Sequence, residues 1–159
     1  MKNKRQQSIL GVGPWLAIVG VVTLLLVLWL DKTLSFAIHV AEHYSQWLRA
    51  IGLCLVAIGL WFWIWSAILV MRGHLCRKLV INGVYRYSRN PMYAAFIVFL
   101  IPALSFVSNN LMILSVSVVM FAAFKILIRK EEVYLRTEFG EEYEQYTKRV
   151  AQLIPFIRI

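Results

Sequence analysis

Charged residues are scarce in this chain of 159 residues. They make up 16% of the sequence, whereas apolar residues make up 60%. An ordinary soluble domain carries about 25% charged and about 45–50% apolar residues. The mean hydropathy is +0.69, so the chain has too few polar side chains to cover a water-soluble globule. The composition therefore predicts an integral membrane protein and excludes an ordinary soluble domain.

Cysteine and acidic residues are also few. The two cysteines, Cys54 and Cys76, form no Cys-x-x-Cys pair, so neither a disulfide framework nor a thiolate metal cage is predicted. The 8 acidic residues face 17 Lys and Arg, which gives a net charge of +9. Because the basic residues flank apolar runs, they indicate contact with anionic lipid headgroups rather than with nucleic acid. No Pro-, Gly- or Ser-rich linker or repeat divides residues 1–159, which predicts a single membrane domain.

Four apolar stretches approach the roughly 20 helical residues that are needed to cross a bilayer. They cover residues 13–30, 51–70, 92–107 and 111–128. The first follows basic residues, as in a signal peptide, but its apolar run is too long and lacks a small-residue cleavage site, so we interpret it as a retained helix. The sequence therefore predicts an all-α integral membrane bundle with about four transmembrane helices.

The segments between and after these stretches have their own patterns. Only Ser108-Asn109-Asn110 separates the last two stretches, which predicts an antiparallel helical hairpin. Apolar residues at helical spacing over Phe36–Leu48 predict an interfacial helix after the first span. Residues 129–159 are predicted to form a cytosolic, helical C-terminal segment.

The distribution of basic residues predicts the orientation in the membrane, because Lys and Arg are retained on the cytoplasmic side. Of the 17 Lys and Arg residues, only Lys32 and Arg49 fall in the segment between the first two spans, and Lys125 falls inside the fourth. The others lie before the first span, between the second and third, or after the fourth. We therefore expect a multi-pass protein with both termini in the cytoplasm.

Polar residues concentrate in two of the predicted cytoplasmic segments. Six of the 8 acidic residues lie between Glu131 and Glu144. The second segment is 79–93, which leads directly into the third span. There, Asn90-Pro91 predicts a helix start, with Asn as the N-cap and Pro in the first helical position. Arg89 beside this positive end of a helix suits an anionic ligand.

These two segments resemble the isoprenylcysteine carboxyl methyltransferase and phospholipid methyltransferase family. Residues 83–93 carry Gly-x-Tyr-x-x-x-Arg-Asn-Pro-x-Tyr, in which Asn90 replaces the commoner His. A hairpin, the pair Glu131-Glu132, and a closing Phe-Gly-Glu-Glu-Tyr-x-x-Tyr pattern with Ile-Pro-Phe-Ile follow. The resemblance covers residues 79–157, about half of the chain.

The resemblance implies a small transmembrane bundle whose cytosolic ends, together with the C-terminal segment, enclose S-adenosylmethionine. A lateral opening would admit a lipid-like or amphiphilic acceptor from the bilayer. Carried over by position, the cofactor-binding residues are Val80, Gly83, Tyr85, Arg89, Asn90, Pro91, Tyr93, Glu131 and Glu132.

The chemistry of these residue types agrees with that assignment. Arg89 suits the cofactor carboxylate, and a glutamate can accept hydrogen bonds from its ammonium or ribose hydroxyls. Tyrosine rings can form aromatic walls beside the sulfonium, and no metal is required. Arg129 is the candidate for orienting the methyl acceptor if that acceptor is an anion. The sequence leaves open whether the acceptor is a carboxylate, an amine or a thiol.

Three other interpretations agree less well with the sequence. His39-Val40-Ala41-Glu42-His43 matches the His-x-x-Glu-His pattern of inverted zinc peptidases, but it lies on the opposite side from the acidic cluster and has no third ligand, so we interpret it as part of the surface helix. An NADPH-dependent membrane reductase of the sterol-reductase type has a similar Pro-x-Tyr element but a longer set of spans. A non-catalytic small membrane protein is disfavoured by the intact Arg89 and Glu131-Glu132.

Overall fold

The protein is a bundle of long helices. The computed structural model describes residues 12–34, 38–76 and 79–154, with the side chains of 74–76 left out, and no strand occurs in these ranges. The predicted basic N-terminus and the Pro155–Ile157 end of the closing motif lie outside the described residues. In chain order the elements are α1 (Gly13–Leu34), α2 (Glu42–Cys76), η2 (Gly83–Arg86), α3 (Pro91–Ala94), η3 (Ala95–Leu100), α4 (Ile101–Val107), η4 (Leu111–Ile113) and α5 (Leu114–Arg149).

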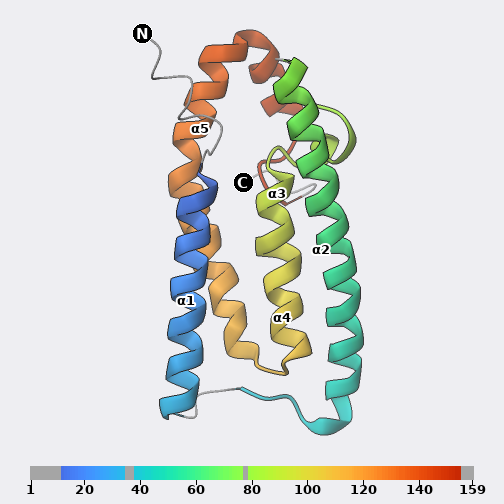
Figure 1. The fold of residues 1–159 in the computed structure, drawn as a ribbon, viewed down its shortest axis with the longest axis vertical. Helices are drawn as coiled ribbons and strands as arrows, with labels where there is room; N and C mark the ends of the chain where they lie inside the picture. The colour runs from blue at the N-terminus through green and yellow to red at the C-terminus, as the bar shows by residue number, and fades with distance from the viewer. Residues whose placement is uncertain (1–11, 35–37, 77–78, 155–159) are drawn as a thin grey trace.

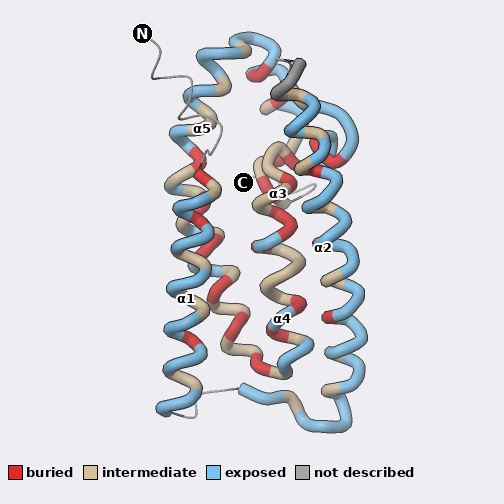
Figure 2. The backbone as a smooth tube through the Cα atoms, in the orientation of Figure 1, coloured by how far each residue is buried: buried red, intermediate tan, exposed pale blue. Residues whose placement is uncertain are grey.

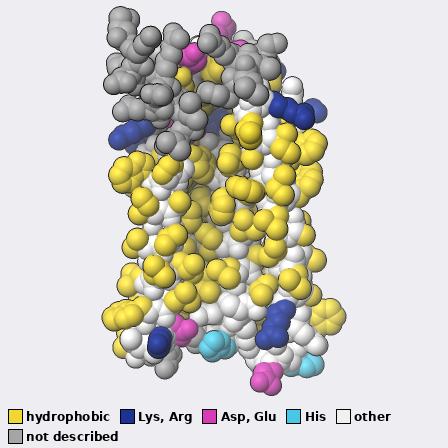
Figure 3. All heavy atoms as spheres, viewed as in Figure 1, with side chains coloured by type: hydrophobic (Ala, Val, Ile, Leu, Met, Phe, Trp, Pro, Cys, Tyr) yellow, Lys and Arg dark blue, Asp and Glu magenta, His cyan; other side chains and the backbone are white. Residues whose placement is uncertain are grey.

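Successive helices run in opposite directions along the long axis of the molecule. Helix α4 lies between α1 and α2, and α5 begins beside α4 and overlaps α1 in this view (Figure 1). Helices α1 and α2 and the helical stretch 111–149 are long and apolar enough to cross a membrane, and Pro91–Val107 is a shorter apolar helix. Figure 3 shows hydrophobic side chains over the middle of the molecule and charged side chains at its two ends. This distribution is that of a helical integral membrane bundle.

Buried residues lie mainly on α3, α4 and α5, whereas most of α1 and α2 faces outward (Figure 2). Trp61, Trp63 and Trp65 are exposed on α2. Outward-facing apolar side chains are expected in a bilayer, because lipid tails solvate them.

Small residues allow α2 to approach the third helical rod of the bundle, Pro91–Val107, closely. Gly52, Gly59 and Ser66 are spaced seven residues apart on α2, and all three are buried. A Cβ atom at Gly52 would lie 2.8 Å from Val107 Cγ2, and one at Gly59 would lie 3.0 Å from Phe99 Cβ. Close backbone approach of this kind is the usual source of helix association in membranes, where van der Waals packing replaces the hydrophobic effect.

The third rod, Pro91–Val107, contains a π-helical section. Pro102 has no backbone N–H, and in an α-helix its ring would clash with the carbonyl of Val98. The wider turns of η3 precede this proline, and Ile101 N–H donates to Phe96 O, five residues back. The rod therefore continues through the proline instead of ending there.

The predicted antiparallel hairpin is present at the end of the bundle where α4 and η4 meet. Its turn packs against residues 38–40. Asn109, at a φ of 52°, accepts from Val40 N–H at 3.1 Å and donates Nδ2–H to Val40 O at 3.0 Å. Asn110 Nδ2–H donates to Asp31 Oδ2 on α1 at 3.0 Å. These contacts join the first loop, the hairpin turn and α1.

The interfacial helix predicted over 36–48 is not a separate element where the structure describes it. Residues 38–41 are non-helical, and α2 begins at Glu42 and continues without interruption. Residues 38–40 bond to the hairpin turn instead of joining a helix. No proline interrupts the chain from Glu42 to Cys76, so the helix that begins at Glu42 extends into the span. His39 therefore lies outside the helix that holds His43, and its Nδ1 is 2.8 Å from Asn109 O. No group of potential metal ligands occurs among the described residues.

Helix α5 bends sharply at Gly140, where φ is 51° and ψ is −124°. The section before this residue extends beyond the other helices, and the section after it turns back toward α2 (Figure 1). Tyr143 and Tyr146 of the closing motif are both buried, and Tyr146 OH donates to Tyr85 O at 2.7 Å. The bend thus returns the end of the chain to the segment that precedes the third rod.

Candidate functional site

The two polar segments meet at the end of the bundle opposite the hairpin turn. Arg89 Nη1–H donates to Glu132 Oε1 at 2.9 Å, and the two side chains are only 13% and 17% exposed. Tyr93 OH donates to Glu131 Oε2 at 3.3 Å. The start of α1 also reaches this place, since a Cβ at Gly13 would lie 3.9 Å from the Tyr93 hydroxyl. Residues more than thirty-five positions apart in the chain therefore form one charged cluster.

Asn90 contributes to the cluster in a different way from the one predicted. It precedes α3 as the N-cap residue, and Pro91 occupies the first turn as expected, but the Asn90 side chain makes no capping bond. Its Nδ2–H donates instead to Gln152 O at 2.9 Å. The predicted side-chain cap is therefore wrong, because the returning C-terminal segment offers the amide a carbonyl acceptor.

The segment after α5 contacts residues 88–90 and fixes their position. Arg89 N–H donates to Ala151 O at 2.8 Å, and Ser88 Oγ–H donates to Gln152 O at 3.5 Å. These backbone contacts attach residues 151–152 to 88–90. They fix the position from which the Arg89 side chain extends toward α5.

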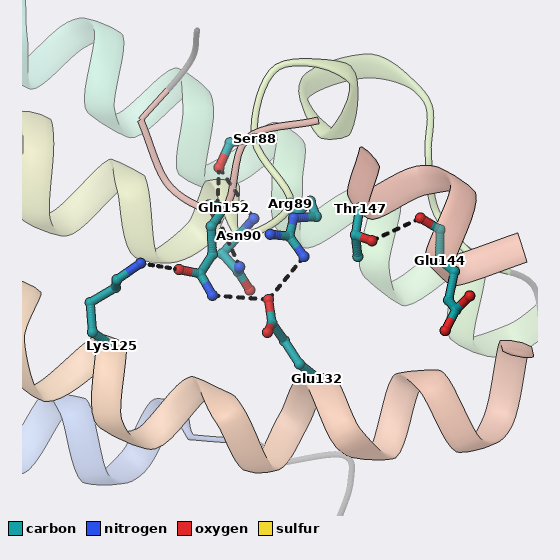
Figure 4. Close-up of polar contacts among 8 residues, drawn as sticks. All are labelled: Ser88, Arg89, Asn90, Lys125, Glu132, Glu144, Thr147 and Gln152. Carbon is teal, nitrogen blue, oxygen red and sulfur yellow. Dashed lines mark hydrogen bonds and ion pairs between the residues drawn. The ribbon is translucent and has the colours of Figure 1, made fainter. Parts of the chain in front are cut away.

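Two members of the cluster, Gln152 and Lys125, are not among the residues predicted from the sequence. Gln152 Nε2–H donates to Glu132 Oε1 at 2.9 Å, and its Oε1 accepts from Lys125 Nζ at 2.7 Å. Figure 4 shows Lys125 and Glu132 extending from the same helix toward Gln152. The available signals were a cation inside an otherwise apolar span and a polar residue between the buried Ala151 and Leu153.

Tyr85 is buried beside this cluster, on η2. Its hydroxyl is 3.0 Å from Ser66 Oγ on α2. Burial raises the pKa of Tyr85 to about 12, the Ser66 hydrogen bond lowers it and the charge of Glu131 raises it. The phenol is therefore neutral at physiological pH. Its hydroxyl attaches η2 to α2, and its ring lies at this end of the bundle.

The other predicted cofactor-binding residues lie nearby with different surroundings. Val80 is half-buried in the segment before η2, and Pro91 is buried. Gly83 has a φ of 61°, and a Cβ there would lie 2.7 Å from Leu69 Cδ1 and 3.0 Å from Trp65 Nε1. The backbone conformation and the contact with α2 therefore already require glycine at this position.

Arg129, the predicted acceptor-orienting residue, is exposed on α5. It precedes Glu131 by two residues, at the point where the apolar part of α5 ends. Its side chain is not brought into the Arg89–Glu132 cluster by any described contact.

One donor in the cluster makes no hydrogen bond to the described part of the chain. Arg89 Nε is buried and has no hydrogen-bond partner among the described residues. Buried polar groups in proteins are nearly always hydrogen-bonded, so such an atom calls for an explanation. The site thus combines a guanidinium with a spare donor, two carboxylates and tyrosine rings, a set of groups that complements a zwitterionic, aromatic ligand.

The fold and this cluster together define a helical integral membrane protein with a charged site at one end of its bundle. The sequence model of one family, described as phospholipid methyltransferase, matches residues 47–142. The matched range includes α2 from residue 47 onward, the third rod and both Glu131 and Glu132. The chain belongs to the phospholipid methyltransferase family.

Named relatives support the same family. The chain is 36% identical over 80 residues to the probable protein-S-isoprenylcysteine O-methyltransferase of Oryza sativa subsp. indica, covering 50% of this chain and 42% of the rice protein. It is 35% identical over 92 residues to the Schizosaccharomyces pombe protein-S-isoprenylcysteine O-methyltransferase, covering 58% and 39%. It is 28% identical over 141 residues to the human protein of that name, covering 82% and 49%. The chain therefore spans less than half the length of these relatives.

Proposed function

We propose that this protein transfers a methyl group from S-adenosylmethionine to a lipid-like or amphiphilic acceptor at the cytoplasmic face of a membrane. The observation that carries this proposal is the contact of Arg89 with Glu132, which joins the two polar segments in one site. The proposal includes four transmembrane crossings with both termini in the cytoplasm. The excess of Lys and Arg in the segments at the site's end of the bundle supports this orientation.

The residues present fit the cofactor. Arg89, whose buried Nε–H has no partner within the described ranges, would hold the cofactor carboxylate through charge-assisted hydrogen bonds. Glu131 and Glu132 would accept from the ammonium and the ribose hydroxyls. Tyr85 and Tyr93 would supply aromatic walls. When bound, S-adenosylmethionine supplies an activated methyl group on a sulfonium.

The protein's contribution to this reaction is position and exclusion of water. Holding two reactants in line lowers the entropic part of the barrier. An aromatic, partly buried site does not oppose a transfer in which positive charge leaves sulfur. Val80, Gly83, Asn90 and Pro91 would serve by fixing the backbone around Arg89 and Tyr85.

A carboxylate acceptor is the favoured class, because the rice, fission-yeast and human relatives are named as O-methyltransferases of isoprenylcysteine. A carboxylate oxygen accepts a methyl group without first losing a proton, so no general base is needed. Arg129, exposed where the apolar part of α5 ends, would orient such an anion as it arrives from the lipid headgroup region.

The proposal is tested by calorimetry on the detergent-purified chain. We expect binding of S-adenosylhomocysteine, and Glu132→Gln is expected to weaken it about tenfold or more, since one charge-assisted hydrogen bond contributes about 1.5–3 kcal/mol. Glu138→Gln, an exposed glutamate on the same helix, is the matched control and should bind as the unaltered chain does. Absence of binding by the folded, unaltered chain would contradict the proposal.

A second measurement identifies the acceptor. Transfer of a radiolabelled methyl group from S-adenosylmethionine into total lipid and membrane-protein extracts shows whether the acceptor is a lipid or a membrane protein. Label released by mild base is expected, because a methyl ester hydrolyses under conditions in which methylated amines and thioethers survive.

A further inference from the structure

A series of side-chain contacts crosses the site from Lys125 to Arg89. Lys125 Nζ donates to Gln152 Oε1 at 2.7 Å, Gln152 Nε2–H donates to Glu132 Oε1 at 2.9 Å, and Arg89 Nη1–H donates to the same oxygen at 2.9 Å. Figure 4 shows Gln152 lying between the lysine and the glutamate. The Glu132 carboxylate is therefore held by two donors that come from two different segments.

The chemistry of the three groups fixes the orientation of the Gln152 amide. An ammonium can only donate hydrogen bonds, and an ionised carboxylate can only accept them. The amide oxygen must therefore face Lys125, and the amide nitrogen must face Glu132. A reversed amide would place oxygen against oxygen and two donors against each other.

The backbone of Gln152 gives this side chain a fixed origin. Gln152 O accepts from Asn90 Nδ2–H at 2.9 Å, and the neighbouring Ala151 O accepts from Arg89 N–H at 2.8 Å. The residue that orients Glu132 is thus attached to the segment that carries Arg89. Lys125 and Glu132 lie about two turns apart on α5, and the bend at Gly140 returns residue 152 to them.

We propose that Gln152 and Lys125 are positioning residues, which hold the Glu132 carboxylate in the orientation that binds the cofactor. The inference rests on the proposed function, in which Glu132 is a cofactor ligand. Both described contacts of Glu132 use Oε1, so they set the plane of the carboxylate and the direction of Oε2. Lys125 acts through Gln152, because its ammonium selects the amide orientation that presents N–H to Glu132.

Four variants test this role. Gln152→Ala removes both side-chain contacts, and Gln152→Glu keeps an acceptor for Lys125 but places a second carboxylate against Glu132. Lys125→Met removes the cation and keeps an apolar side chain that suits the span, while Lys125→Arg keeps a cationic donor. Lys130→Met, which replaces an exposed lysine on the same helix, is the control.

The measurements are the dissociation constant of S-adenosylhomocysteine, the KM of S-adenosylmethionine, kcat and the thermal midpoint. We expect Gln152→Ala, Gln152→Glu and Lys125→Met to raise the dissociation constant and KM about tenfold, which corresponds to about 1.4 kcal/mol, with a smaller change in kcat. Lys125→Arg should restore most of the affinity. The double variant Gln152→Ala/Lys125→Met should equal Gln152→Ala alone, since both changes break one series of contacts.

A purely structural role predicts a different pattern, in which the thermal midpoint falls while the dissociation constant of the folded fraction stays unchanged. That pattern, or unaltered binding by Gln152→Ala and Lys125→Met, would overturn the inference and leave the proposed function intact. Failure of the unaltered chain to bind would remove the proposed function and this inference together. If Gln152→Ala does not fold, Lys125→Met decides, because it leaves the backbone contacts of Gln152 in place.

Discussion

Arg89 and Glu132 are the residues through which the two polar segments of the chain meet. Their side chains are 13% and 17% exposed, so both charges are largely removed from solvent and each compensates the other. Removing one member of a buried ion pair leaves an uncompensated charge and costs about 3–5 kcal/mol, and the slight exposure here reduces that cost. Conservative replacements such as Glu132→Gln therefore report on ligand binding better than truncation to alanine does.

Arg129 offers a residue-scale prediction, because it is exposed and contributes no described contact to the cluster. If it orients an anionic acceptor, Arg129→Ala will raise the KM of a carboxylate acceptor about tenfold and leave the KM of S-adenosylmethionine unchanged. Steady-state methyl transfer with each substrate varied in turn measures both constants. Lys130→Ala, the neighbouring exposed cation, should alter neither. An unchanged acceptor KM in Arg129→Ala would remove this residue from the site.

Among the elements, α5 contributes most to the site, because it carries Lys125, Glu131 and Glu132 and then reverses at Gly140. A φ of 51° with a ψ of −124° corresponds to the first central position of a type II′ turn, which strongly favours glycine. A Cβ at Gly140 would meet no atom within 4 Å. The requirement for glycine is thus purely one of backbone conformation.

This predicts that Gly140→Ala destabilises the protein by about 1–3 kcal/mol, the cost of a strained backbone position, although the added methyl group has space. The thermal midpoint in detergent should fall, and affinity for S-adenosylhomocysteine should fall with it, because the bend returns residues 150–154 to Arg89. Glu141→Ala, an exposed helical neighbour, serves as the control. A Gly140→Ala variant as stable as the unaltered chain would mean that the bend does not need a positive φ.

At the scale of the whole molecule, polar contacts fasten both ends of an otherwise apolar bundle. The charged cluster joins α1, the third rod and α5 at one end. At the other, Asn109 and Asn110 join the hairpin turn to Val40 and Asp31. The hairpin turn lies at one end of the long axis and the charged cluster lies toward the other (Figure 1), so we expect their effects on stability and on binding to be separable.

Two substitutions at Asn109 test this separation. Asn109→Gly keeps the positive φ but loses the two hydrogen bonds to Val40, at about 0.5–1.5 kcal/mol each. Asn109→Ala loses the hydrogen bonds and also strains the backbone. Thermal midpoints should therefore fall in the order unaltered chain, Asn109→Gly, Asn109→Ala, while the dissociation constant of S-adenosylhomocysteine stays the same. Weaker binding in either variant would show that the two ends are coupled.

Much of the helical architecture followed from the sequence. Long apolar runs predicted α1, α2 and α5, the three-residue polar connection predicted the hairpin, and Pro91 predicted the start of the third rod. These features depend on neighbouring residues, which is why a single sequence reveals them. A separate interfacial helix and an Asn90 side-chain cap, both predicted from local patterns, do not occur among the described residues, because distant hydrogen-bonding groups in the hairpin turn and in residue 152 compete with the local preference.

The sequence by itself determined that the chain is a membrane protein and which residue types its polar segments offer, since composition, apolar run length and motif spacing are local properties. Only the tertiary structure decided which of those residues meet. The reversal at Gly140 places residues 150–154 against 88–90 and sets Gln152 between Lys125 and Glu132. No local pattern encodes those contacts, because they arise from the packing of segments that lie tens of residues apart.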